Sequence, residues 1–191
     1  MTAGYSTSVF DVIDDHVKYQ ELAKISISAF EDNPLYYLTH PKGDSAEIED
    51  YHCKTMIKFT KKDRVKTITV VDDSKDAQKI VAFAIIFLGP KPQTQAMEPP
   101  VYSDFSFVNS VKNQTGRCDD YEKDISIGST MLEKVLEIAS FEKRGVFLKA
   151  TPKGKGLYEK NGFQVMAEAR VSLKEYKQGG FYVQSTMVKR G

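Results

Sequence analysis

The segment from Gly145 to Val165, GVFLKATPKGKGLYEKNGFQV, constrains the fold more than any other part of the chain. Its first half begins after Gly145 with an apolar run at 146–148, which has the length and composition of a buried strand. Pro152 and Gly154 predict the end of that strand and a turn. The segment therefore opens as a strand that leads into a turn.

The second half of the segment predicts a short helix and another strand. We expect the helix over about 155–160, where it would carry Tyr158. Asn161 and Gly162 predict its end, because both residues tolerate the left-handed conformation of a helix C-terminus. Phe163 then opens a new strand. Tyr158 is thus expected on a helix beside a strand end, where a catalytic group can be held rigidly.

The remainder of the chain predicts further strands and helices. Asp14 and Asp15 are expected to cap a first helix, and Asp44 with Glu47 forms a capping-box pattern before a second helix. Polar or Pro-rich stretches predict a turn at 72–79 and loops at 89–100 and 109–124, with a Gly-containing turn at 179–180. Strands are expected at 8–13, 65–71, 80–88, 101–108, 163–173 and 181–188, and helices at about 16–30, 45–59 and 128–141.

Composition limits the classes of protein to which the chain can belong. Its 191 residues suit a single domain, 1–191, with a sizeable core. A formal net charge of +1 gives no field that would favour nucleic acid or a membrane surface. No secretory signal is visible at the N-terminus, and Cys53 and Cys118 lack metal-site spacing. We expect a cytoplasmic protein with reduced thiols, although a disulfide between the two cysteines stays open.

The small-residue turn Ala150-Thr151-Pro152, with a tyrosine four residues before Gly162-Phe163, resembles the GNAT acetyltransferase superfamily, closest to its fungal members. The predicted element order, β-α-α-β-β-β-α-β-α-β-β, is similar to that of the superfamily over nearly the whole chain. The resemblance implies an α+β fold with three layers, in which helices flank a central, mostly antiparallel mixed sheet. It also implies N-acetyl transfer from acetyl-CoA.

In the family that the chain resembles, the acyl-CoA pyrophosphate lies at the N-terminus of the third helix, where unpaired N–H groups and the helix dipole favour an anion. The family loop has the form Gln/Arg-x-x-Gly-x-Gly/Ala. Here only Gly128 fits cleanly, Ser126 replaces the first glycine, and Asp124 adds an unfavourable charge. The cofactor-binding residues implied are Lys123, Ser126, Ile127, Gly128, Ser129 and Thr130.

The resemblance also implies catalytic roles. Tyr158 would protonate the leaving CoA thiolate as general acid, although it is equally suited to a core position. A backbone N–H near Phe107, Val108 or Asn109 would polarise the thioester carbonyl. Asp104 is the candidate general base; water, with Asp104 as an exposed strand carboxylate, is the alternative.

The three histidines do not suggest a metal site. His52 lies on an apolar helical stripe, where a satisfied, partly buried imidazole is expected. His40 belongs to the loop between the first two helices, and His16 is expected at the surface. Their spacing fits no local metal motif. No Ser-His-Asp or Cys-His signature is present either.

These observations predict an acetyl-CoA-dependent N-acetyltransferase that acts on a small-molecule amine by direct attack on the thioester. The chain is expected to be a monomer or homodimer without nucleic-acid or membrane partners. The departures at Ser126 and Asp124, with the long 109–124 insert, keep an alternative open. In that alternative the fold has lost acyl-CoA binding, and it binds or transforms a small, partly apolar molecule.

Overall fold

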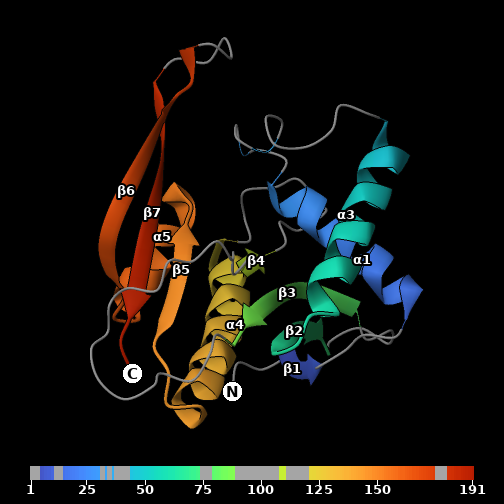
Figure 1. The fold of residues 1–191 in the computed structure, drawn as a ribbon, viewed down its shortest axis with the longest axis horizontal. Coiled ribbons are helices and arrows are strands. Elements are labelled where there is room, and N and C mark those ends of the chain that lie inside the picture. The colour runs from blue at the N-terminus through green and yellow to red at the C-terminus, as the bar shows by residue number, and fades with distance from the viewer. Residues whose placement is uncertain are drawn as a thin grey trace.

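The computed structural model describes residues 5–10, 15–30, 33, 36, 44–73, 79–88, 108–110, 121–174 and 180–191; for 108–110 and 121–126 it describes the backbone alone. Within this part of the chain, helices and antiparallel strands follow one another in the order that the sequence predicts (Figure 1). The elements are β1 (Tyr5–Phe10), α1 (His16–Phe30), α3 (Ser45–Thr60), β2 (Val65–Asp72), β3 (Lys79–Phe87), β4 (Val108–Ser110), α4 (Tyr121–Phe141), β5 (Val146–Ala150), α5 (Pro152–Lys160), β6 (Gln164–Ser172) and β7 (Phe181–Lys189).

The predicted fold class is confirmed, because helices flank antiparallel sheet, and the described strands divide into two such sheets. The first has the order β1-β2-β3-β4, and the second has the order β5-β7-β6. Within the first sheet, β3 alternates between two apolar layers. Phe83 packs with α1 and α3, whereas Ala82 and Ala84 pack with α4. The first sheet is therefore covered on both faces, which is why β3, KIVAFAIIF, reads as a nearly continuous apolar run.

Helix α4 lies between the two sheets (Figure 1). Ile127, Met131 and Val135 recur every four residues and pack against β2 and β3. Leu132, one position further round the helix, packs in a separate cluster with β5, α5 and β7. Helix α4 thus joins the two halves of the core.

The capping signals are confirmed for the first two helices. Asp15 Oδ1 accepts a hydrogen bond from the N–H of Val17 at 2.9 Å at the start of α1. Asp44 Oδ1 accepts from the N–H groups of Ala46 and Glu47, at 3.0 and 2.9 Å. Each carboxylate satisfies donors that the first helical turn leaves unpaired.

The predicted 109–124 loop is wrong at both ends. Residues 109–110 belong to β4, and helix α4 begins at Tyr121 rather than near Gly128. The segment 121–127 contains neither Gly nor Pro, and Ile127 belongs to the buried stripe of α4. Because residues 121–126 are mostly polar, the sequence pattern does not indicate that the helix begins there. Of the strand predicted at 101–108, only Val108 lies among the described residues.

Strand β6 is exposed along nearly its whole length. Val165 is 39% exposed and Met166 is 54% exposed, and every residue of β6 except Val171 is exposed. β6 is the edge strand of the second sheet, and α5 packs on β5 and β7 instead. A register shift between Val165 and Ala167 interrupts the regular pairing of β6 with β7.

No described helix is long and apolar enough to cross a membrane.

Candidate active site

Tyr158 lies on α5, which follows directly from strand β5. The helix begins at Pro152, three residues earlier than predicted, so Pro152 and Gly154 form its first turn rather than a preceding turn. Thr151 Oγ1 accepts a hydrogen bond from the Gly154 N–H at 3.2 Å. A threonine at the N-cap favours a helix start here, because its side chain pairs with an N–H of the first turn. Proline fits the first helical position, because the N–H that it lacks would be unpaired there in any residue.

The Tyr158 ring lies over this first turn. A Cβ added to Gly154 would be 3.4 Å from Tyr158 Cε2. Helical side chains lean toward the N-terminus, so the ring of residue 158 covers the turn that contains Gly154. The phenol is therefore directed toward the N-terminal end of α5, where β5 ends.

The phenol of Tyr158 is buried, and it is protonated at neutral pH. Its side chain is 6% exposed, and its ring meets that of Phe163 edge-on at a centroid distance of 5.6 Å. Desolvation raises the pKa of Tyr158 from 10.0 to about 12, because burial disfavours the phenolate. Tyr158 is thus a core residue, and at neutral pH it carries the proton that a general acid must donate.

The C-terminal end of α5 is fixed to β7. Asn161 Nδ2 donates to Leu157 O at 2.8 Å, and Lys189 Nζ of β7 donates to Asn161 O at 2.7 Å. A lysine at this end of a helix also complements the helix dipole. Gly162 adopts the left-handed conformation with φ 83°, as predicted, whereas Asn161 with φ −96° does not.

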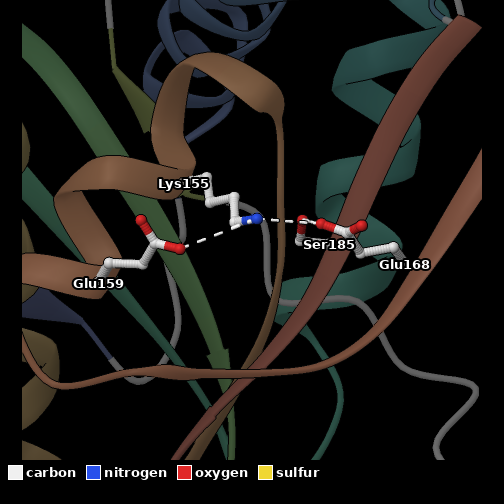
Figure 2. A network of polar contacts seen from close by, with 4 residues as sticks. All are labelled: Lys155, Glu159, Glu168 and Ser185. Atoms are coloured by element: carbon white, nitrogen blue, oxygen red, sulfur yellow. Dashed lines mark hydrogen bonds and ion pairs between the residues drawn. The ribbon is translucent and has the colours of Figure 1, made fainter.

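A second polar contact ties the first turn of α5 to the same sheet. Lys155 Nζ donates to Glu168 Oε1 at 3.0 Å, and Ser185 Oγ donates to the same oxygen at 3.2 Å. Figure 2 shows the Lys155 ammonium between Glu168 and Glu159, whose Oε1 lies 3.8 Å from Nζ. We call Lys155, Glu168 and Ser185 the α5 clasp.

The α5 clasp is charged at neutral pH. The hydrogen bond from Lys155 lowers the pKa of Glu168, and the Ser185 hydroxyl lowers it further. The hydrogen bond to Glu168 in turn raises the pKa of Lys155. Ser185 is only 2% exposed and lies opposite Glu168 in the β6–β7 register. The clasp thus joins a helix, an edge strand and the central strand of the sheet.

The predicted oxyanion donors belong to β4. Val108 and Asn109 pair with Ala84 and Phe83 of β3, which places them at an edge of the first sheet. Strand β5, which leads to Tyr158, lies at an edge of the second sheet, and among the described residues it is not paired with β4. Asp104 and Phe107 lie outside the described residues.

The predicted cofactor residues lie within helix α4 rather than at its start. Because α4 begins at Tyr121, its unpaired N–H groups among the described residues are those of 121–123, and Lys123 is the only predicted cofactor residue among them. The N–H groups of Ser126 through Thr130 fall within the regular helix. Ser129 and Thr130 are partly exposed in the third turn.

Ile127 and Gly128 face the protein core. Ile127 is 3% exposed and packs with Met131 against the first sheet. Gly128 is also buried, and a Cβ added to it would be 3.2 Å from Leu157 Cδ2 of α5. The glycine that best matches the phosphate loop therefore allows close packing of α4 against α5.

His52 is the satisfied core imidazole that the sequence predicts. It is 6% exposed, its Nε2 lies 2.9 Å from the Tyr36 hydroxyl, and the two rings stack at 5.6 Å. His16 is exposed, with its Nε2 4.0 Å from Cys53 Sγ. Cys53 is a free, buried thiol, while His40 and Cys118 lie outside the described residues.

The segment between α1 and α3 also contacts the C-terminal sheet. Asn33 Nδ2 donates to the Tyr182 hydroxyl of β7 at 3.1 Å, although the two residues are 149 positions apart. Tyr182 is 7% exposed, and burial raises the pKa of its phenol. Asn33 and Tyr36 thus connect this segment to β7 on one side and to α3 on the other.

Among the described residues, no group of three or more His, Cys, Asp or Glu side chains is arranged to hold a metal ion.

Two features of the site were missed from the sequence. The Thr151-Pro152 pair before a helix was a readable N-cap signal, but it was interpreted as a strand-ending turn. The contact of Lys155 with Glu168 had no local signal, because it depends on the register of β6 with β7 and on how α5 crosses the sheet.

The whole structure is similar to solved acetyltransferase structures. A GCN5-related N-acetyltransferase from Rhodopseudomonas palustris has a TM-score of 0.55 at 14% identity, over 100% of this chain and 98% of that one. A GNAT-family acetyltransferase from Streptococcus pneumoniae has a TM-score of 0.51 at 16% identity, over 96% and 99%. An Escherichia coli N-acetyltransferase named for the alanine of a ribosomal protein has a TM-score of 0.56 at 15% identity, over 96% and 92%.

No protein-family model matches the sequence, and the search of curated proteins finds no match. The structural similarity nevertheless extends over almost the full length of each chain. The chain therefore has the fold of the GCN5-related N-acetyltransferases.

Proposed function

We propose that this chain is an acetyl-CoA-dependent N-acetyltransferase that acts on a small-molecule amine in the cytoplasm. The observation that carries the proposal is the position of Tyr158 on α5, the helix that follows directly from β5 in this fold, with a phenol that is protonated at neutral pH. The acetyltransferase names of the structural neighbours support the same reaction class. A closer relation to fungal members stays a prediction.

In the proposed reaction, the neutral amine nitrogen attacks the thioester carbonyl carbon, and the carbon–sulfur bond breaks. The amine loses a proton to Asp104 or to water, and the leaving sulfur takes one from Tyr158. A phenol with a pKa of about 12 is a weaker acid than an ordinary thiol by about 3.5 units. Tyr158 would therefore stabilise the developing thiolate first by donating a hydrogen bond.

Carbonyl polarisation is assigned to the backbone of β4. Strand β4 is paired with β3 on one side only among the described strands, which leaves its other edge available to an acyl group. An N–H of Phe107, Val108 or Asn109 would donate to the carbonyl oxygen as negative charge develops there.

The start of α4 is the better fit for the pyrophosphate of acetyl-CoA. The N–H groups of residues 121–123 are unpaired within the helix, and Lys123 adds a cation in the same turn. Ile127 and Gly128 do not fit that role, because both face the core. Ser126, Ser129 and Thr130 remain proposed contacts for other parts of the co-substrate.

The acceptor is proposed to be a small amine, but a peptide amine must be tested beside it. Two structural neighbours are named for the alanine of a ribosomal protein. An acceptor screen should therefore pair small amines with short peptides that begin with alanine. Acetylation of peptides alone would overturn the small-molecule part of the proposal.

One observation favours the alternative, a GNAT fold that has lost acyl-CoA binding. The loop expected to cradle the pyrophosphate is helical, and its glycine packs against Leu157 rather than facing a ligand. In this alternative the fold binds a small, partly apolar molecule, and Tyr158 has a structural role alone.

Calorimetric titration with acetyl-CoA and with free CoA separates the two functions. We expect micromolar binding that Lys123→Glu weakens by at least tenfold, because the substitution places a negative charge beside a phosphate. Lys174→Glu is the matched control: it makes the same charge change at an exposed residue after β6. Absence of binding at millimolar co-substrate would overturn the transferase and favour the alternative.

A further inference from the structure

Helix α5 is held at both ends by charged side chains, and Tyr158 lies between them. Lys189 of β7 holds the C-terminal end through Asn161 O at 2.7 Å. Lys155 holds the first turn through Glu168 Oε1 at 3.0 Å. Because both contacts lead to the same sheet, they restrict sliding and tilting of the helix across it.

The Tyr158 ring rests on the turn that the α5 clasp holds. Gly154, whose added Cβ would be 3.4 Å from Tyr158 Cε2, precedes Lys155 directly. The ring therefore has the clasped turn beneath it and Phe163 at its edge. A shift of that turn would change the packing beneath the Tyr158 ring and would let water reach the phenol.

The clasp has features that an ordinary surface ion pair lacks. Exposed ion pairs contribute little, because water screens them and holding both side chains loses entropy. Here one carboxylate oxygen accepts from both Lys155 and Ser185, and Ser185 is 2% exposed on the central strand. The buried serine fixes the carboxylate, which then fixes the lysine (Figure 2).

We propose that Lys155 and Glu168 are positioning residues for Tyr158, and that the α5 clasp sets the orientation and hydration of its phenol for acetyl transfer. Only the kinetic part of this inference rests on the proposed function. Neither residue is assigned contact with a substrate. Both act through the first turn of α5.

The phenol itself provides a test that does not need activity. Ultraviolet titration of each variant, with the matching Tyr158→Phe variant subtracted, isolates the ionisation of Tyr158. We expect its pKa to fall by about one unit in Glu168→Gln and in Lys155→Met, because a loosened turn admits water. A purely Coulombic effect would instead move the two variants in opposite directions, since one removes a negative and the other a positive charge.

Glu159→Gln is the matched control. Glu159 also approaches Lys155, at 3.8 Å, but both residues lie on α5, so their contact does not join the helix to the sheet. This variant removes the same charge as Glu168→Gln and should leave the titration unchanged. Lys155→Arg keeps the donor and should also behave like the unmodified protein.

The kinetic arm tests the consequence for catalysis. Glu168→Gln should lower kcat about fivefold to tenfold and leave the KM for acetyl-CoA within twofold, since misplacement of a catalytic group affects the chemical step. In a Tyr158→Phe background, Glu168→Gln should cause no further loss of kcat, because the hydroxyl that Glu168 positions is absent.

Each outcome decides one of the two proposals. An unchanged Tyr158 titration in Glu168→Gln and Lys155→Met would overturn the positioning role, as would an equal shift in Glu159→Gln. Absence of acetyl transfer in the unmodified protein would overturn the proposed function instead. The titration would then still show whether the clasp controls the phenol.

Discussion

Gly128 of α4 packs against Leu157 of α5, so closely that a Cβ on the glycine would be 3.2 Å from Leu157 Cδ2. Most real Cβ contacts are wider than this, so a larger residue at 128 would require Leu157 to move. The contact joins α4, which lies between the two sheets, to α5, which carries Tyr158. It explains why a glycine is placed inside α4, where it lowers helix propensity.

Enlarging residue 128 should separate the two helices. We expect Gly128→Val to lower the free energy of unfolding by about 1–3 kcal/mol, because overpacking outweighs the gain in helix propensity. Urea unfolding measures the change. In a Leu157→Ala background the same substitution should be nearly neutral, since the obstructing side chain is gone. An equal loss in both backgrounds would contradict the proposed steric cause.

Two glycines of the Tyr158 region should respond to alanine in opposite directions. Gly156 is exposed, and an added Cβ meets nothing within 4 Å, so Gly156→Ala should stabilise the protein by about 0.5–1 kcal/mol. Gly162 has φ 83°, and Gly162→Ala should destabilise it by about 1 kcal/mol. Thermal unfolding of the two variants provides the comparison, and a shift of the same sign in both would contradict it.

The sequence was sufficient to predict the order of elements and the β5–α5–β6 segment, because their signals are local. Apolar runs, Asp44 as a cap and Gly162 as a helix end depend on near neighbours only. The start of α4 was mistaken because its first turn is polar, and only Ile127 reveals a buried stripe.

The candidate site was less predictable, because its geometry depends on packing between distant segments. Tyr158 was correctly expected on a helix after a strand, but the direction of its ring depends on Gly154 and Phe163. Gly128 matched a phosphate loop in sequence, yet the approach of Leu157 gives it a packing role. No local pattern indicates which of the two roles a glycine has.

The Asn33–Tyr182 hydrogen bond should couple the two halves of the chain. The two residues lie 149 positions apart, and Asn33 Nδ2 donates to the Tyr182 hydroxyl at 3.1 Å. A double-mutant cycle with Asn33→Ala and Tyr182→Phe should give a coupling energy of about 0.5–1.5 kcal/mol in urea unfolding. A cycle of Asn33→Ala with Tyr5→Phe is the control. Strict additivity in the first cycle would show that the bond does not contribute to stability.

Alkaline pH should reveal the buried phenol of Tyr158 in the stability of the fold. Below pH 10 the phenol is protonated in both the folded and unfolded states, so it adds no pH dependence. Between pH 10 and about 12 the unfolded state ionises first, because burial holds the folded pKa at about 12. The free energy of unfolding should therefore be about 2.3 kcal/mol lower at pH 12 than at pH 8, with about 1.4 kcal/mol of that loss by pH 11.

Tyr158→Phe isolates this contribution, because Tyr182 and the other tyrosines titrate in both proteins. Urea unfolding of both proteins from pH 8 to 11 should show a shallower decline for the variant. The difference between their free energies of unfolding should be about 1.4 kcal/mol smaller at pH 11 than at pH 8. Parallel curves would mean that the phenol reaches water in the folded state. A phenol with an ordinary pKa of about 10 is still protonated at neutral pH, so this outcome would contradict the burial of the Tyr158 phenol and not its role as proton donor.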